Sequence, residues 1–187
     1  FIWFNLPGLI AIIISVSAIA VTAQVVARER ELGTFDQLLV SPLGVTEIMI
    51  GKMMPTFLVG MLNGLLFLVA AQLVFGVPFT GSLGPFLIAM ACYNISLIGL
   101  GMVCSAASTT MQQAFLGSFL VSVPIILLSG FASPIDNMPG WLQTITLANP
   151  ARWFMAISHG SFLKSMPGEV VFALTWPMLL IALVTLA

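Results

Sequence analysis

Charged residues are concentrated in one short window of this 187-residue chain, and long apolar runs fill most of the rest. Seven of the eleven charged side chains lie between Arg28 and Lys52, while 60% of all residues are hydrophobic and the mean hydropathy is +1.16. A soluble globule could not bury that much apolar surface. The sequence therefore predicts an all-α, polytopic membrane bundle that forms a single transmembrane domain over residues 1–187.

Five segments are long and apolar enough to cross a bilayer, which takes about 20 residues. The spans are expected at about 6–27, 46–75, 83–105, 110–129 and 169–187. Residues 28–45 then form a cytoplasmic segment, and residues 130–168 form an external hairpin. Within the second span, Gly60 and Gly64 are spaced so that another helix can approach closely.

Basic residues predict the orientation of the chain. Arg28, Arg30 and Lys52 surround one loop, and the positive-inside rule places that loop in the cytoplasm. The amino end of the chain is then outside, and the carboxyl end is cytoplasmic. Because Phe1 is not an initiator methionine and Ala187 ends an apolar run, we expect a fragment of a longer protein that lacks an earlier span and an external region.

The charged window contains a predicted short amphipathic helix. Thr34 and Gln37 fit a capping box at its start, and Pro42 must end it. Its apolar face consists of Phe35, Leu38 and Leu39. The next helix is expected to follow the break at Gly44, with Thr46 as its N-cap.

Two interpretations of this short helix are open. It could rest on lipid headgroups, or it could dock on another protein. A helix that rests on headgroups is usually rich in Lys and Arg. Here Glu29, Glu31 and Asp36 accompany two arginines, which favours a protein surface.

Several kinds of chemistry have no signal in this sequence. Cys92 and Cys104 lie about 18 Å apart along one predicted helix, and no Cys/His spacing indicates a metal site. There is no P-loop and no hydrolase motif, and the net charge of −1 is too small to imply nucleic acid as a partner. The spans also lack the buried ionisable groups that ion-coupled carriers use. We therefore expect no enzyme activity, no cofactor bound by this chain and an energy source outside it.

The loop before the last span predicts two short helices. Pro139 suits the start of the first, and Asn149 followed by Pro150 suits the start of the second. An interfacial aromatic belt is expected from Trp141, Trp153 and Phe154. The hairpin could anchor the chain or act as a gate. Arg152 is expected to stabilise the hairpin or to contact a lipid headgroup, and His159 is expected to be interfacial.

Several runs together carry a family resemblance. In the charged window these runs are 28–34 and 37–43, followed by Glu47, Gly51, Lys52 and Pro55, and in the outer loop they are 133–139 and 141–142. The chain resembles the ABC type 2 transporter permeases, in their multidrug-efflux-like subgroup. In such proteins the window forms a coupling helix that sits in a cleft of the ATP-binding subunit. The spans equivalent to the first and fourth line the pathway at a dimer interface.

The resemblance implies the membrane-spanning subunit of an ATP-driven ABC exporter. Its partners would be an ATP-binding subunit that holds the ATP, a second permease subunit, identical or related, and membrane lipid. The implied docking residues are Glu29, Glu31, Gly33, Thr34, Phe35, Leu38 and Leu39. The candidate pathway residues are Gln24, Ser15, Gln113, Ser118 and Ser122, whose polar groups could equally hold helices together. Weakly polar surroundings suit amphipathic, drug- or lipid-like cargo crossing the inner membrane. The alternative function is a passive channel or a facilitator-type carrier.

Overall fold

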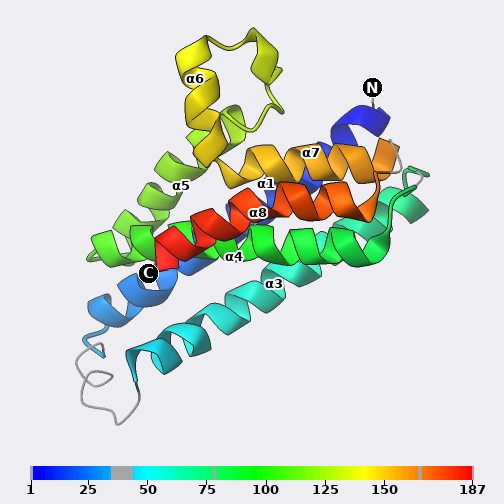
Figure 1. The fold of residues 1–187 in the computed structure, drawn as a ribbon. Helices are drawn as coiled ribbons and strands as arrows, with labels where there is room; N and C mark the ends of the chain where they lie inside the picture. The colour runs from blue at the N-terminus through cyan, green and yellow to red at the C-terminus, as the bar shows by residue number, and fades with distance from the viewer. Residues whose placement is uncertain (1, 35–43, 78, 164–165, 187) are drawn as a thin grey trace.

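Helices make up most of the computed structural model, which describes residues 2–34, 44–77, 79–163 and 166–186 (Figure 1). The long helices are α1 (Ile2–Glu31), α3 (Val45–Leu73), α4 (Leu83–Ala107), α5 (Met111–Leu127) and α8 (Gly168–Leu186). Between α5 and α8 lie two shorter helices, α6 (Gly140–Ile145) and α7 (Pro150–Leu163), and 3-10 turns at Ile135–Asn137 and Thr146–Ala148. No strand occurs in these residues, and the predicted all-α membrane bundle is confirmed.

Each long helix begins and ends within a few residues of an expected span. By length and composition, α1, α3, α4 and α8 can cross a membrane. Helix α5 has 17 residues, or about 26 Å at 1.5 Å per residue, which is less than a hydrocarbon core of about 30 Å. A crossing by residues 110–129 therefore stays a prediction.

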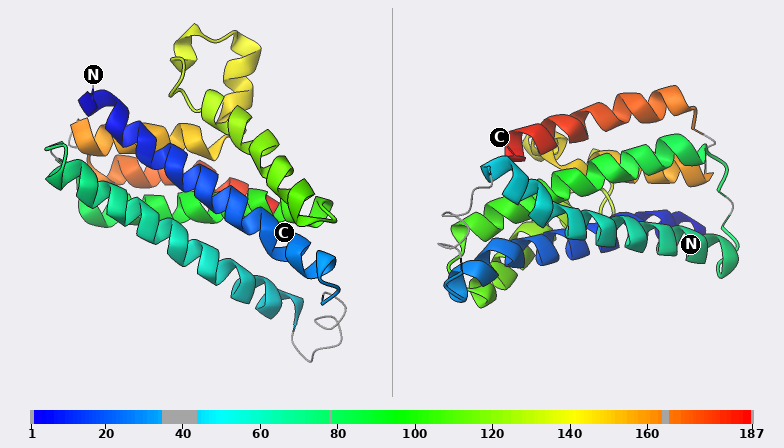
Figure 2. Two further views of the ribbon diagram at one scale, coloured as in Figure 1. Left: turned by 180° about the vertical axis from the view of Figure 1, so that it is seen from behind. Right: turned by 90° about the horizontal axis from the view of Figure 1, so that it is seen from below.

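Helices α1 and α4 form the centre of the bundle. Half of the most apolar stretch of α1 and 61% of that of α4 are buried, against 22% for α3 and for α8. Helix α1 contacts α3, α4, α5 and α7, and α4 contacts α8 as well. Figure 2 shows α3 and α5 on opposite sides of α1. The central position of α1 matters because its end carries the charged window.

An aromatic core joins α7 to the centre. The ring of Tyr93 on α4 stacks on that of Phe154 on α7, with 4.4 Å between ring centroids. The expectation that Phe154 belongs to an interfacial belt is therefore wrong, because the packing of α7 on α4 buries its side chain completely. Trp141 is 67% exposed and Trp153 is partly exposed.

Three helix starts can be compared with the sequence-based expectations. Helix α6 begins at Gly140, one residue after the expected Pro139, which is its N-cap. Helix α7 begins at Pro150 as expected, and the side-chain oxygen of Asn149 accepts a hydrogen bond from the Ala151 N–H at 3.0 Å. The N-cap of α3 is Gly44, so the expectation of Thr46 is wrong. The backbone N–H of Gly44 donates to Glu47 Oε2 at 3.0 Å, which lets the helix start two residues earlier.

The close approach predicted at the two glycines of α3 is confirmed, and the approaching helix is α4. A Cβ at Gly60 would overlap the amide of Asn94, and a Cβ at Gly64 would overlap the sulfur of Met90. The Asn94 amide nitrogen also donates to the Phe57 carbonyl at 2.9 Å. Helix α3 therefore contacts α4 through bare backbone.

We expect Gly60→Ala to destabilise the bundle by about 1–3 kcal/mol, because the new methyl group must displace Asn94. The measurement is thermal unfolding of the purified full-length protein in detergent. Gly51→Ala on the same helix is the matched control, since a Cβ there meets nothing within 4 Å. Equal unfolding temperatures for the two variants would contradict the close contact.

Candidate functional site

The charged residues 28–31, which were expected to lie in a loop, extend α1 instead. Helix α1 continues to Glu31, and Gly33 follows with φ of 70°, a left-handed conformation that favours glycine. The N–H of Thr34 donates to the Glu29 carbonyl at 3.0 Å, and that of Gly33 donates to the Arg30 carbonyl at 3.2 Å. These bonds are typical of a helix C-cap. Gly33 therefore sets the direction in which the chain leaves α1.

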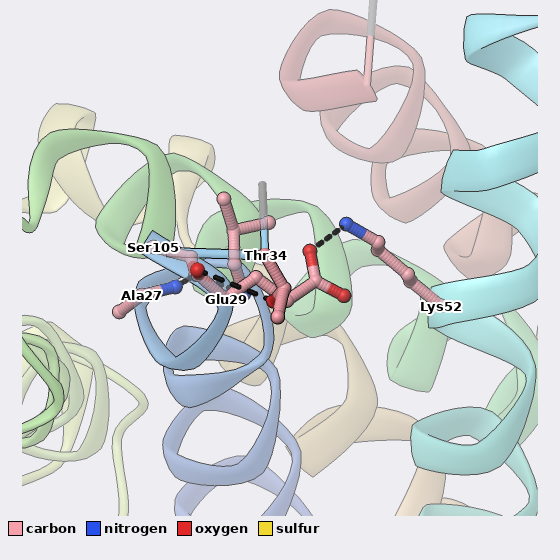
Figure 3. A network of polar contacts seen from close by, with 6 residues as sticks. Ala27, Glu29, Thr34, Lys52 and Ser105 are labelled. Carbon is pink, nitrogen blue, oxygen red and sulfur yellow. Dashed lines mark hydrogen bonds and ion pairs between the residues drawn. The ribbon is translucent and has the colours of Figure 1, made fainter. Parts of the chain in front are cut away.

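Glu29 forms an ion pair with Lys52 of α3 (Figure 3). Both side chains are well shielded from solvent, with 14% of Lys52 and 25% of Glu29 exposed. The predicted coupling helix lies in the sequence between these two residues. The pair therefore holds the two flanks of that segment together.

Arg30 and Glu31 bind the turn between α4 and α5. The Arg30 Nη1 donates to the carbonyl oxygens of Ala106 at 2.8 Å and Ser108 at 3.2 Å. The Glu31 Oε2 accepts from the backbone N–H of Met111, the first residue of α5, at 2.6 Å. Helix ends leave such backbone groups unpaired, so the two side chains satisfy both sides of the turn.

Ser105 of α4 adds a buried link to α1. Its hydroxyl oxygen accepts from the backbone N–H groups of Val26 at 3.0 Å and Ala27 at 3.2 Å (Figure 3). We call Glu29, Arg30, Glu31, Lys52 and Ser105 the α1 junction. Through it, the last turns of α1 are bonded to α3, α4 and the start of α5.

Only some of the predicted docking residues lie in the described part of the chain. Glu29 and Glu31 belong to the α1 junction, and Gly33 and Thr34 directly follow α1. The remaining docking candidates, Phe35, Leu38 and Leu39, lie outside the described residues. Sequence reasoning used Lys52 only for orientation and for the family resemblance and did not place Lys52 or Ser105 in the site, because their partners are distant in the chain.

The candidate pathway residues are not brought together into one lining. Ser15 is buried in the core, where its hydroxyl lies 3.0 Å from that of Tyr93. Ser118 and Ser122 of α5 are buried, and each hydroxyl donates at 2.6 Å to a carbonyl oxygen of the same helix. These three serines therefore have partners within the bundle.

The two glutamines differ from the serines. Gln24 is partly exposed on α1, and Gln113 is exposed at the start of α5, where its side-chain oxygen accepts from the Thr109 N–H at 3.0 Å. Gln113 also lines a groove of about 530 Å³ between α4 and α5, with Cys104 and Leu120 among its neighbours.

Nowhere in the described ranges is there a group of three or more His, Cys, Asp or Glu side chains that could hold a metal ion.

Comparison with known proteins places the chain in a family. Residues 1–163 match the family described as ABC-2 type transporter. This chain belongs to the ABC-2 type transporter family. The ABC-2 match includes α1, the charged window and the hairpin up to the end of α7.

Several curated relatives of this ABC-2 chain are permeases. The probable multidrug ABC transporter permease YbhR of Escherichia coli strain K12 is 44% identical over 183 residues, which are 98% of this chain and 50% of the relative. The probable multidrug ABC transporter permease YbhS of that strain is 34% identical over 178 residues, 86% of this chain and 45% of the relative. The inner membrane transport permease YhhJ of the same strain is 33% identical over 181 residues, which are 95% of this chain and 47% of the relative. The chain thus spans about half the length of these relatives. No solved structure matches it.

We expect Lys52→Glu to destabilise the ABC-2 bundle by about 1 kcal/mol, because two carboxylates would then face each other. Combining it with Glu29→Lys restores opposite charges and should recover most of that loss. Thermal unfolding of the two single variants and the double variant measures this coupling. Glu169→Lys, at an exposed carboxylate of α8, is the control for a change of charge alone. If the changes in stability of the two single variants simply add up in the double variant, the ion pair contributes nothing to the stability of the bundle.

Proposed function

We propose that this chain is the membrane-spanning region of the permease subunit of an ATP-driven ABC exporter. The permease moves amphipathic, drug- or lipid-like cargo across the inner membrane. It works as a dimer with a second permease subunit, and a separate ATP-binding subunit supplies the energy. The observation that carries this proposal is the α1 junction, which bonds four helices together beside the segment predicted to be the coupling helix.

Docking of the ATP-binding subunit is assigned to the segment that follows α1. In this proposal Phe35, Leu38 and Leu39 supply an apolar contact, and Thr34 and Gly33 fix the start of the segment. A displacement of the segment pulls on α1 and α3 together, because the Glu29–Lys52 pair joins its flanks.

The same displacement reaches α4 and α5 through the turn between them. Arg30 holds the end of α4, and Glu31 holds the first N–H of α5. Since packed helices move as stiff bodies, a push at this end shifts all four of them. The junction thus converts a local contact with the ATP-binding subunit into movement of the bundle.

The proposed orientation places the α1 junction in the cytoplasm. It is supported by Arg28, Arg30 and Lys52, which gather at this end of the bundle. The hairpin with α6 lies away from this end (Figure 1). The amino end of the chain is then outside, and the carboxyl end is cytoplasmic.

Leu38→Asp in the full-length protein tests the docking assignment. We expect at least about tenfold less ATP-binding subunit to co-purify, because a carboxylate would enter an apolar contact. The amount of inserted permease should not change. The matched control is Leu163→Asp, at an exposed leucine at the end of α7. Undiminished co-purification of the ATP-binding subunit with Leu38→Asp would refute the docking assignment, and ion flux without that subunit would favour a channel.

Glu31→Arg tests whether the junction transmits movement. A guanidinium cannot accept from the Met111 N–H, so we expect ATP hydrolysis by the purified complex to become independent of cargo. The readout is ATPase activity with and without the amphiphile ethidium, next to ethidium efflux from cells. Glu169→Arg controls for the added positive charge. A Glu31→Arg complex that is stimulated and exports like the parent would contradict the transmission role.

A further inference from the structure

A cavity of about 550 Å³ lies between the loop that follows α5 and the helices α7 and α8. Its apolar walls include Phe131, Met155 and Leu174, and its polar side includes Asp136, Arg152 and His159. None of these residues belongs to the α1 junction or to the candidate pathway. The cavity is therefore a separate feature, and it combines charged groups with an apolar surface.

The guanidinium of Arg152 lines this cavity and is held in place by hydrogen bonds. Its Nη1 donates to the Gln143 carbonyl at 3.0 Å and also to the hydroxyl of Thr146, and its guanidinium lies 5.6 Å from the ring centroid of Trp153. These contacts confirm the expected role of Arg152 in stabilising the hairpin. They use one of the two terminal nitrogens and hold the planar group in place.

The remaining donors of Arg152 have no acidic partner among the described residues. Its side chain is only partly exposed, and no carboxylate of the described residues pairs with it. A guanidinium that keeps unused donors beside a cavity can bind an anion there. The guanidinium fork fits the oxygens of a phosphate group particularly well.

Asp136 supplies the opposite charge at the same cavity. Its side chain is exposed, and its carboxylate makes no hydrogen bond or ion pair with another described residue. The cavity thus carries one cation and one anion that do not form an ion pair with each other. A ligand that complements both must itself have two opposite charges.

We propose that this cavity binds the zwitterionic headgroup of a phospholipid. The phosphate contacts the guanidinium of Arg152, and the ammonium group lies near the carboxylate of Asp136. The acyl chains follow the apolar wall that includes Met155 and Leu174, the latter on the candidate membrane span α8. Phosphatidylethanolamine has this combination of charges, whereas phosphatidylglycerol has the phosphate without the ammonium group.

Lipid binding to the delipidated full-length protein tests the proposal, with phosphatidylethanolamine and phosphatidylglycerol as probes and native mass spectrometry as the readout. We expect the parent to prefer phosphatidylethanolamine. Arg152→Gln should weaken binding of both lipids by about tenfold, the loss of one charged hydrogen-bonding group. Asp136→Asn should remove the preference and leave phosphatidylglycerol binding unchanged. Because the Asp136 carboxylate is exposed and forms no hydrogen bond or ion pair with another described residue, Asp136→Asn should leave the stability of the hairpin unchanged.

Arg28→Gln and Glu169→Gln are the matched controls, since both side chains are exposed and neither lines the cavity. Soluble phosphoethanolamine serves as a third probe, and we expect it not to displace the lipid because it cannot use the apolar wall. The proposal is overturned if the cavity variants behave like the controls, or if phosphoethanolamine displaces the lipid at equal concentration. Both results are independent of ATPase coupling, so they leave the proposed transport function untouched.

Discussion

In apolar surroundings, every backbone group that a helix leaves unpaired must find a partner inside the protein. In addition to the hydrogen bonds within each helix, a few hydroxyl groups of this bundle bond to the backbone of a different helix. Ser96 of α4 donates to the Met178 carbonyl of α8 at 2.6 Å, and Ser158 of α7 donates to the Pro7 carbonyl of α1 at 2.8 Å. Together with Ser105, these serines connect α1, α4, α7 and α8. With so few polar groups available, their positions largely decide how the helices are placed.

Helix α1 is connected to its neighbours along its whole length, but α3 is not. The links of α1 run from Pro7 near its start to Glu31 at its end. Helix α3 instead contacts α4 through glycine backbone, and the ion pair that joins it to α1, made by Lys52 with Glu29, lies close to its start. The bundle therefore has a firmly connected centre and a more loosely attached outer helix. The coupling segment joins these two parts in the chain.

The long helices could be predicted because their apolar runs end at charges, glycines or prolines. The end of α1 could not, since a mixed run of Arg and Glu suits a loop as well as a helix, and here the helix is extended by contacts with a distant turn. Phe154 was misplaced because its burial depends on how α7 packs, which the sequence of α7 does not reveal. Likewise, a serine such as Ser118 looks the same in a sequence whether it lines a path or bonds to its own helix. The residues of the α1 junction are visible in the sequence, but their pairing is not.

The order of the two charges at the end of α1 has a consequence of its own. Arg30 faces the carbonyl end of α4, which carries partial negative charge, and Glu31 faces the amino end of α5, which carries partial positive charge. The dipeptide is thus an electrostatic match to a break between two helices. The same two residues in reverse order would keep composition and net charge but oppose both helix ends. This position therefore requires a basic residue followed by an acidic one in the sequence, and a count of charges does not detect that order.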